Sequence, residues 1–136
     1  MNLLPPPTGG YLQWFLLYEG LAAQIHSVVC YLVPAATALV PFRGPNAPPP
    51  HPLLAHVYGT KNIYSGLIRL YAAYNLTSPH LYDLALWSLI GVFWLYGMEC
   101  GVYRTVNVRD ATWPLTFSTV GIVWMLMQRD FYLGSP

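Results

Sequence analysis

The sequence predicts an all-α, polytopic membrane protein: one domain of 136 residues, built as a bundle of four transmembrane helices. The first observation is composition, because 55% of the residues are hydrophobic and only 8% are charged, against about 25% charged in ordinary soluble domains. The second is that four apolar segments approach or exceed the roughly 20 residues that a helix needs to cross a bilayer. The third is the very short connection between the second and third segments, which predicts a tight helical hairpin.

The first span is predicted at about residues 11–33, after a short proline-containing arm. It carries Glu19 and His26, which are seven residues apart and therefore lie on one face of a helix. We interpret this polar stripe as a face that contacts other helices through hydrogen bonds. A proton relay or a ligand site on the same face is the alternative.

A proline-rich loop is predicted at residues 34–52, where seven of the nineteen residues are proline. Proline removes a backbone donor and clashes with the preceding turn, so this stretch cannot sustain a regular helix. Its composition is typical of a linker with polyproline character. It serves either as a spacer or as an interaction loop.

The second and third spans, about 53–76 and 80–104, are each more than twenty residues long and mostly apolar. A charge at the centre of a membrane helix costs about 2.5–3.5 kcal/mol on insertion scales, so ionisable residues there need partners. The two spans carry four such residues: Lys61, Arg69, Asp83 and Glu99.

The short connection places these four charges in two pairs. In a hairpin that turns near Ser78, Arg69 and Asp83 are offset by about four residues, or roughly 6 Å along the axis, and so are Lys61 and Glu99. Long basic side chains can span that offset. We therefore predict two intramembrane ion pairs, Arg69–Asp83 and Lys61–Glu99. The alternative is that Lys61 and Asp83 extend their polar ends to the membrane interface.

The third span also contains Gly97-Met-Glu-Cys-Gly101, a GxxxG pattern. Glycines at this spacing allow two membrane helices to approach closely. We predict a helix-packing or partner-binding face at Gly97 and Gly101, with Glu99 between them.

The fourth span is predicted at about 113–128 and opens with Trp113-Pro114, which places the proline in the first helical turn. It closes with the motif Gln128-Arg129-Asp130-Phe131-Tyr132, which we place at the membrane interface as an anchor or a partner contact.

Basic residues in the loops predict the orientation. Arg43, Arg104 and Arg109 lie in the first and third loops, whereas Arg129 alone lies on the side of the termini. The positive-inside rule then favours cytoplasmic first and third loops and lumenal termini.

Catalytic motifs are missing from the sequence. The four histidines form no HExxH or HxxHH cluster, and the chain has no GxGxxG, P-loop or GxSxG. We therefore predict no catalytic residue, no metal site and no cofactor. The net charge of +1 predicts no nucleic-acid partner. An enzyme that works with scattered carboxylates such as Glu19, Asp83 and Glu99 is the alternative.

Several short motifs resemble those of the ergosterol biosynthetic protein 28 family, in the same order and with similar spacing. They cover about Tyr58–Gly134, while the first span fits the family in character and the loop 34–52 departs from its pattern. The motifs are Tyr58-Gly-Thr60, Leu67-Ile-Arg69-Leu-Tyr71, Asn75-Leu76, Pro79-His80, Gly97-Met-Glu99, Tyr103-Arg-Thr105, Pro114-Leu115, Ser118-Thr119, Val123-Trp-Met125 and Gln128-Arg-Asp-Phe-Tyr-Leu-Gly134.

The resemblance implies a small four-span protein of the endoplasmic reticulum membrane with a non-enzymatic role. It would be a scaffold that gathers the sterol C-4 methyl oxidase, the C-3 sterol dehydrogenase/decarboxylase and the 3-keto sterol reductase, with the sterol C-24 methyltransferase as a further neighbour. The resemblance also implies self-association into a homo-oligomer. The alternatives are a small sterol-binding protein, with a site lined by Tyr64, Trp87 and Trp94, and a sterol isomerase-like enzyme that uses Glu19 or Glu99.

Overall fold

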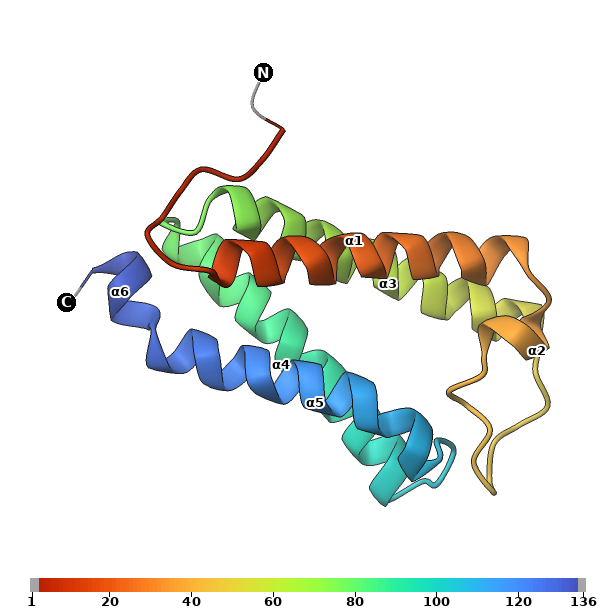
Figure 1. Cartoon of the computed structure of the whole chain (residues 1–136). Coiled ribbons are helices and arrows are strands. Elements are labelled where there is room, and N and C mark those ends of the chain that lie inside the picture. Colours follow the sequence, from red (N-terminus) through yellow and green to blue (C-terminus); the bar gives the residue numbers. More distant parts are fainter. Residues whose placement is uncertain (1–2, 135–136) are drawn as a thin grey trace.

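The computed structural model describes residues 3–134, and this range contains helices and no strands (Figure 1). Four long helices and two short ones follow one another along the chain. They are α1 (Leu12–Leu32), α2 (Ala35–Ala38), α3 (Pro52–Tyr74), α4 (Pro79–Gly101), α5 (Val108–Met127) and α6 (Arg129–Leu133).

Two of the long helices, α1 and α4, are long and apolar enough to cross a membrane by length and composition. The prediction of an all-helical chain is confirmed, and α1 and α4 correspond to the predicted first and third spans. The other two long helices carry more polar residues, including Lys61 and Arg69 in α3 and Arg109 and Asp110 in α5.

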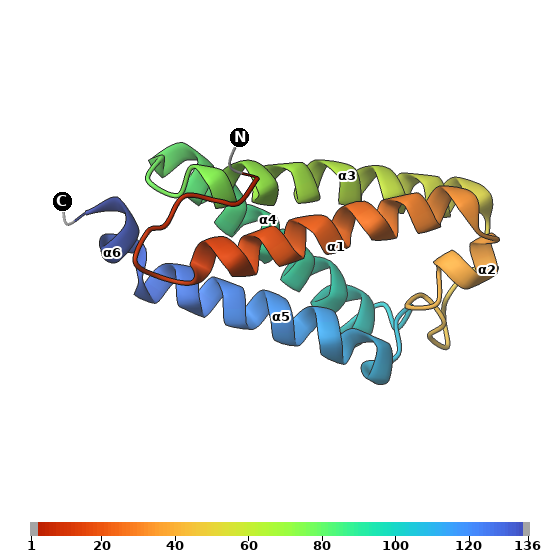
Figure 2. The ribbon, with the colours of Figure 1, turned by 45° about the horizontal axis from the view of Figure 1, so that its top comes forward.

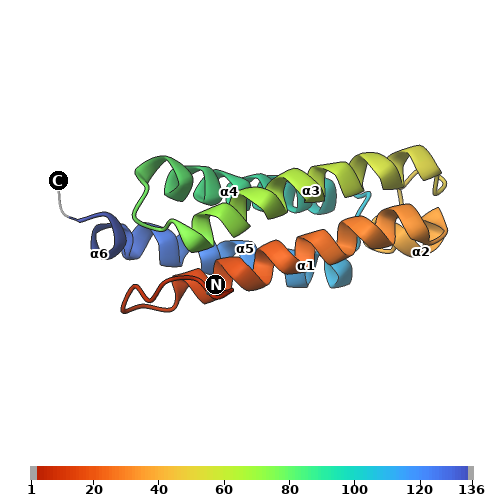
Figure 3. The same ribbon diagram turned by 90° about the horizontal axis from the view of Figure 1, so that it is seen from above.

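The helices α1 and α3 run side by side along most of their length (Figure 3). Glycines make this approach close. A Cβ atom added at Gly66 would lie 2.5 Å from Nε2 of Gln24 and 3.0 Å from the carbonyl oxygen of Gly20. One added at Gly59 would lie 2.8 Å from Cβ of Cys30. Small residues that let helix backbones meet are the usual basis of packing between membrane helices.

The helices α3 and α4 are joined by a short connection, as the sequence predicts, but they do not form a tight hairpin along their length. They diverge in Figure 1, and an open groove of about 540 Å³ lies between them. The groove is lined by residues of α3 such as Tyr64 and Ile68 and by residues of α4 such as Gly91 and Leu95. A short connection fixes only where two helices meet, not the angle at which they leave.

The two loops that follow α1 and α4 dock on each other. Gly44 N–H donates to the carbonyl oxygen of Thr105 (2.9 Å) and Asn46 N–H to that of Arg104 (3.1 Å). Arg104 presents its carbonyl from a left-handed conformation, with φ at 58°. The proline-rich loop thus contains the short helix α2 and is held to the loop after α4 by backbone hydrogen bonds.

The N-terminal arm before α1 and the short helix α6 lie at the opposite end of the molecule from these loops (Figures 1 and 2). The hydroxyl of Tyr132 accepts a hydrogen bond from Leu12 N–H (3.1 Å), and the hydroxyl of Tyr74 donates to the carbonyl oxygen of Leu3 (2.6 Å). These bonds hold α6 and the N-terminal arm against the bundle.

The last long helix begins earlier than predicted. α5 starts at Val108, so Pro114 lies inside the helix rather than in its first turn. A proline inside a helix removes one hydrogen bond and crowds the preceding turn. Here the start of the helix is stabilised by Asp110, whose negative charge lies near the positive end of the helix dipole. The sequence pattern around Trp113 therefore marked the apolar part of α5 and not its start.

Candidate functional site

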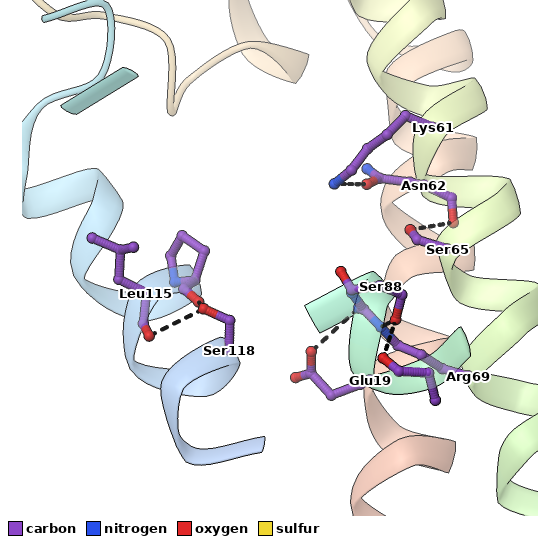
Figure 4. A network of polar contacts seen from close by, with 10 residues as sticks. Glu19, Lys61, Asn62, Ser65, Arg69, Ser88, Leu115 and Ser118 are labelled. Atoms are coloured by element: carbon purple, nitrogen blue, oxygen red, sulfur yellow. Dashed lines mark hydrogen bonds and ion pairs between the residues drawn. The ribbon is translucent and has the colours of Figure 1, made fainter. Parts of the chain in front are cut away.

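A polar cavity of about 190 Å³ lies halfway along the bundle, between α1, α3, α4 and α5. One cluster of apolar core residues, which includes Leu16 and Leu89, fills the end with the termini. A second cluster, which includes Cys30 and Val106, fills the end with the loops. The polar cavity therefore lies between two apolar layers, and Figure 4 shows several of its side chains.

Arg69 of α3 joins three helices in the wall of this cavity. Its side chain is 5% exposed, and its Nη1 lies 3.5 Å from Oε2 of Glu19 on α1. Its Nε donates to Oγ of Ser88 on α4 (3.0 Å) and its Nη2 to the Ser88 carbonyl oxygen (3.1 Å). The planar guanidinium can make these contacts together because its donors point in several fixed directions.

Lys61 is the second cation of the cavity and extends from the same side of α3 as Arg69 (Figure 4). Its Nζ donates to Oδ1 of Asn62 (3.1 Å) and lies 5.1 Å from the centroid of the Tyr58 ring. The Asn62 amide nitrogen lies 3.0 Å from Nδ1 of His26. No carboxylate among the described residues forms an ion pair with Lys61.

Aromatic side chains cover the cavity on the side of the loops. The hydroxyls of Tyr58 and Tyr96 are hydrogen-bonded to each other between α3 and α4. The ring of Phe42, from the proline-rich loop, packs edge-on against Tyr58 with ring centroids 5.1 Å apart. The His26 ring meets Tyr58 in the same way at 5.4 Å. The loop therefore packs against Tyr58, one of the residues that line the cavity.

The predicted ion pair between Arg69 and Asp83 is wrong. Arg69 pairs with Glu19, whereas Asp83 pairs with Arg129, which follows α5. The Asp83–Arg129 pair is half-exposed, and its hydrogen bonds raise the pKa of the Arg129 guanidinium above its ordinary value.

The predicted ion pair between Lys61 and Glu99 is also wrong. The carboxylate of Glu99 accepts a hydrogen bond from the Thr105 hydroxyl. The backbone carbonyl oxygen of Glu99 accepts another from Thr105 N–H (2.8 Å). Glu99 thus fixes the turn that ends α4. It lines a second cavity together with Lys61, but no ion pair joins the two side chains.

Both errors have one cause. The expected depth of the hairpin is correct, because Tyr58 contacts Tyr96 and Arg69 contacts Ser88. A hairpin fixes how far along the helix axis each residue lies. It does not fix how each helix is rotated about that axis. Rotation turns Asp83 towards α6 and places Ser88 opposite Arg69.

The polar stripe of α1 faces this cavity. Glu19 contacts Arg69 and His26 contacts Asn62, so both residues lie against α3. The sequence pattern did not single out Asn62 or Ser88. A signal was present for Asn62, because it lies between Gly59 and Gly66 at spacings that place all three on one helix face.

Gly97 and Gly101 are not packed within the described chain. A Cβ atom added at either position would meet nothing within 4 Å. The glycines that bring helices together are instead Gly20, Gly59 and Gly66, between α1 and α3, together with Gly121 of α5. The GxxxG face of α4 is therefore an open surface.

The motif that closes the fourth predicted span is divided between two environments. Gln128 accepts a hydrogen bond from Nε1 of Trp124 (2.7 Å), Arg129 pairs with Asp83, and Tyr132 is buried. Phe131 and Asp130 are exposed. The motif thus fastens α6 to the bundle with some of its residues and leaves two at the surface.

The three residues proposed for a sterol site do not enclose one within this chain. Tyr64, Trp87 and Trp94 are each about two-thirds exposed, at 66%, 66% and 67%. The polar site of the bundle is the cavity around Lys61 and Arg69. It offers two cations, one carboxylate and several hydroxyl or amide groups, which suit it to bind and orient a group rich in oxygen atoms.

The comparisons that found a match all name the same protein family. A family model described as Erg28 like protein matches residues 12–123 of the chain. The chain is 30% identical over 134 residues to ergosterol biosynthetic protein 28 of Candida albicans, covering 98% of this chain and 96% of that protein. It is 29% identical over 126 residues to the protein of the same name in Saccharomyces cerevisiae, covering 92% and 84%. In Schizosaccharomyces pombe the identity is 27% over 115 residues, covering 84% and 82%. No solved structure matches the chain.

Proposed function

We propose that this chain, which belongs to the Erg28-like family of ergosterol biosynthetic proteins, is a non-enzymatic scaffold of the endoplasmic reticulum membrane. In this proposal it holds enzymes of sterol biosynthesis close to one another. The family supports the pathway, since the matched relatives are named for ergosterol synthesis.

The proposed scaffold crosses the membrane four times, through α1, α3, α4 and α5. The apolar helices α1 and α4 support two of these spans directly. For α3 the support is that its charged residues, Lys61 and Arg69, point into the bundle rather than outwards. Large apolar side chains such as Leu21, Ile25 and Trp94 are exposed on the outside. An outer surface of this kind needs lipid or protein partners.

The observation that carries the scaffold proposal is the open face of α4. Gly97 and Gly101 have no neighbour that a Cβ atom would meet, and Phe93 and Trp94 beside them are exposed. A helix from another protein can approach a glycine face closely, and aromatic side chains next to it add contact area. We place the main partner-binding surface here.

The partners we propose are the sterol C-4 methyl oxidase, the C-3 sterol dehydrogenase/decarboxylase and the 3-keto sterol reductase, with the sterol C-24 methyltransferase as a further neighbour. A second copy of the chain is also proposed to bind. Tethering raises the effective concentration of one enzyme for the next to about the millimolar range. A lipid-soluble intermediate then meets the next enzyme before it diffuses away.

The test is crosslinking of the tagged chain in native membranes, followed by its purification and mass spectrometry. We expect the methyl oxidase and its two successor enzymes to be recovered with the unmodified chain and lost with Gly97→Leu. The matched control is Gly91→Leu, because Gly91 is also open but lies in the groove between α3 and α4. Recovery of the enzymes with Gly97→Leu, or their absence with the unmodified chain, would contradict the proposal.

An isomerase-like enzyme is disfavoured by the positions of its candidate acids. Glu19 lines the polar cavity, whereas Glu99 lines a separate, mostly apolar cavity and is bonded to Thr105. The two carboxylates therefore do not share one site. Conversion of a sterol by the purified chain, lost in Glu19→Gln with the fold intact, would replace the scaffold proposal with the enzymatic one.

A further inference from the structure

The polar cavity in the middle of the bundle contains more positive than negative charge. Lys61 and Arg69 line it together with one carboxylate, Glu19, while His26 is its only other ionisable side chain apart from tyrosines. Arg69 is in contact with Glu19 and with both oxygens of Ser88. The negative charge of the site is therefore already engaged.

Lys61 is the group whose charge is not matched. An ammonium has three donor positions, and the described residues supply one hydrogen-bond acceptor, Oδ1 of Asn62. The Tyr58 ring gives a further, weaker contact at 5.1 Å. A cation in an apolar protein interior is costly unless an anion or several oxygen atoms accompany it. An anion bound in the cavity would supply both charge and acceptors.

The cavity has a mouth between α1 and α5. Tyr18 and Trp113 line it and are 53% and 65% exposed. Phe117 stacks close to Trp113, with ring centroids 4.3 Å apart, and lines the cavity as well. Closer to the termini, Phe15 packs against α5 through Phe117 and Trp124 and closes the gap. The opening is therefore aromatic, while the charged groups lie behind it.

The volume limits what can enter. Pockets that hold whole drug-sized ligands are about 300–1,000 Å³, and this cavity is about 190 Å³. It has room for a small head group but not for a lipid body. The apolar part of such a lipid must extend out of the cavity through the aromatic mouth, where it contacts the apolar surface of α1 and α5.

We propose that this cavity binds the carboxylate head group of a lipid, with the ammonium of Lys61 as its ion-pair partner. The apolar body of the lipid lies over Tyr18, Trp113 and Phe117, at the mouth between α1 and α5. A carboxylate fits because it is small, carries one negative charge and accepts several hydrogen bonds. Two sources share this chemistry: a long-chain fatty acid and an acid built on a sterol ring system.

The experiment uses the full chain in lipid nanodiscs and two photoreactive probes. One is a long-chain fatty acid and the other a steroid carboxylic acid, each with a diazirine in its apolar part. We expect saturable labelling by at least one acid, with crosslinks on α1 and α5 around Tyr18 and Trp113. The acid that labels identifies the source. Absence of saturable labelling by both acids would overturn the proposal, as would crosslinks confined to other helices.

The neutral methyl ester of the same probe is the first control. It needs no variant, so it tests the proposal even if a substitution prevents folding. We expect the ester to compete at least about tenfold less well than the acid, as expected when a charge-assisted hydrogen bond is lost. Equal competition by the ester and the acid would show that the carboxylate is not recognised.

Variants of Lys61 provide the second control. We expect Lys61→Met to weaken labelling at least about tenfold and Lys61→Arg to retain it. The matched control is Arg109→Gln, which removes an exposed basic residue outside the cavity and should leave labelling unchanged. Equal labelling of Lys61→Met and the unmodified chain would overturn the proposal. Partner enzymes are absent from this assay, so its outcome is independent of the scaffold proposal.

Discussion

The two helix pairs that contain α3 are packed in opposite ways. α1 and α3 are separated in the chain by a long proline-rich loop, yet they lie in contact along most of their length. α3 and α4 are separated by only a few residues, yet a groove of about 540 Å³ opens between them. Proximity in the sequence therefore does not decide which helices of this protein pack tightly.

Small residues explain the difference. Where α1 meets α3, Gly20 and Gly66 leave no room for a Cβ atom on either side. On α4 the glycines Gly91, Gly97 and Gly101 have open space around them. The lesson is that glycine spacing identifies a surface capable of close approach, but the opposing helix must offer small residues as well. Only the α1–α3 pair supplies both.

The largest effect is expected from Gly66→Leu. The new Cβ atom would lie 2.5 Å from Gln24 and 3.0 Å from the Gly20 backbone, so the helices must separate. Overpacking costs about 1–3 kcal/mol and more where backbone blocks relaxation, and we expect a loss of at least about 3 kcal/mol. The measurement is the free energy of unfolding in detergent micelles. Gly97→Leu is the control and should unfold as the unmodified chain does; equal losses in the two variants would remove the distinction between the pairs.

A second large effect is expected from Arg69→Met. This change leaves the Glu19 carboxylate, whose side chain is only 16% exposed, without its cation. Removing one partner of a buried ion pair costs about 3–5 kcal/mol, whereas replacing both is often far less harmful. We therefore expect the double variant Glu19→Gln/Arg69→Met to be more stable than Arg69→Met alone. A double variant that is less stable than the single one would show that Arg69 acts mainly through Ser88.

The fold was predictable from the sequence where apolar length decides it. Helices occupy the four predicted segments, with α1 and α3 within a residue or two of their expected ends. The start of α5 was not predictable from Pro114, because a helix tolerates a proline inside it when the neighbouring turns are held by other contacts. The docking of the proline-rich loop was not predictable either, since it depends on backbone hydrogen bonds to a loop about sixty residues away.

The ionisable residues of the candidate site were predictable, but their pairing and their uncharged partners were not. Glu19, His26, Lys61 and Arg69 stood out as ionisable groups in apolar segments, and all four line one cavity. Their partners depend on the rotation of each helix, which an apolar sequence leaves undefined because faces towards lipid and protein look alike. The spacing of Gly59 and Gly66 in α3 would have indicated which face of this helix meets α1.

A smaller effect is expected from Gly44→Ala, which tests the loop contact that joins the α1–α3 pair to the α4–α5 pair. A Cβ atom there would lie 2.3 Å from the Arg104 carbonyl oxygen and 2.7 Å from Val106 N. We expect the loops to separate at a cost of about 1–3 kcal/mol, and proteolysis within residues 34–52 to become faster. Gly101→Ala, at an open position, is the control. An unchanged cleavage rate in Gly44→Ala would show that the loops are held by other contacts.

The smallest effect is expected at the second ion pair, which sharpens the contrast between buried and exposed charges. Asp83 and Arg129 have side chains that are 44% and 39% exposed, against 16% and 5% for Glu19 and Arg69. Exposed ion pairs contribute about 0–1 kcal/mol and are screened by salt. Asp83→Asn should therefore lower the free energy of unfolding by less than about 1 kcal/mol, and the difference should shrink as salt is raised. Measuring both variants at low and high salt compares the two pairs directly. Because water and ions reach the Asp83–Arg129 pair, only this pair should respond to salt; an equal response at Arg69 would mean that the central cavity is as open to solvent as the helix ends.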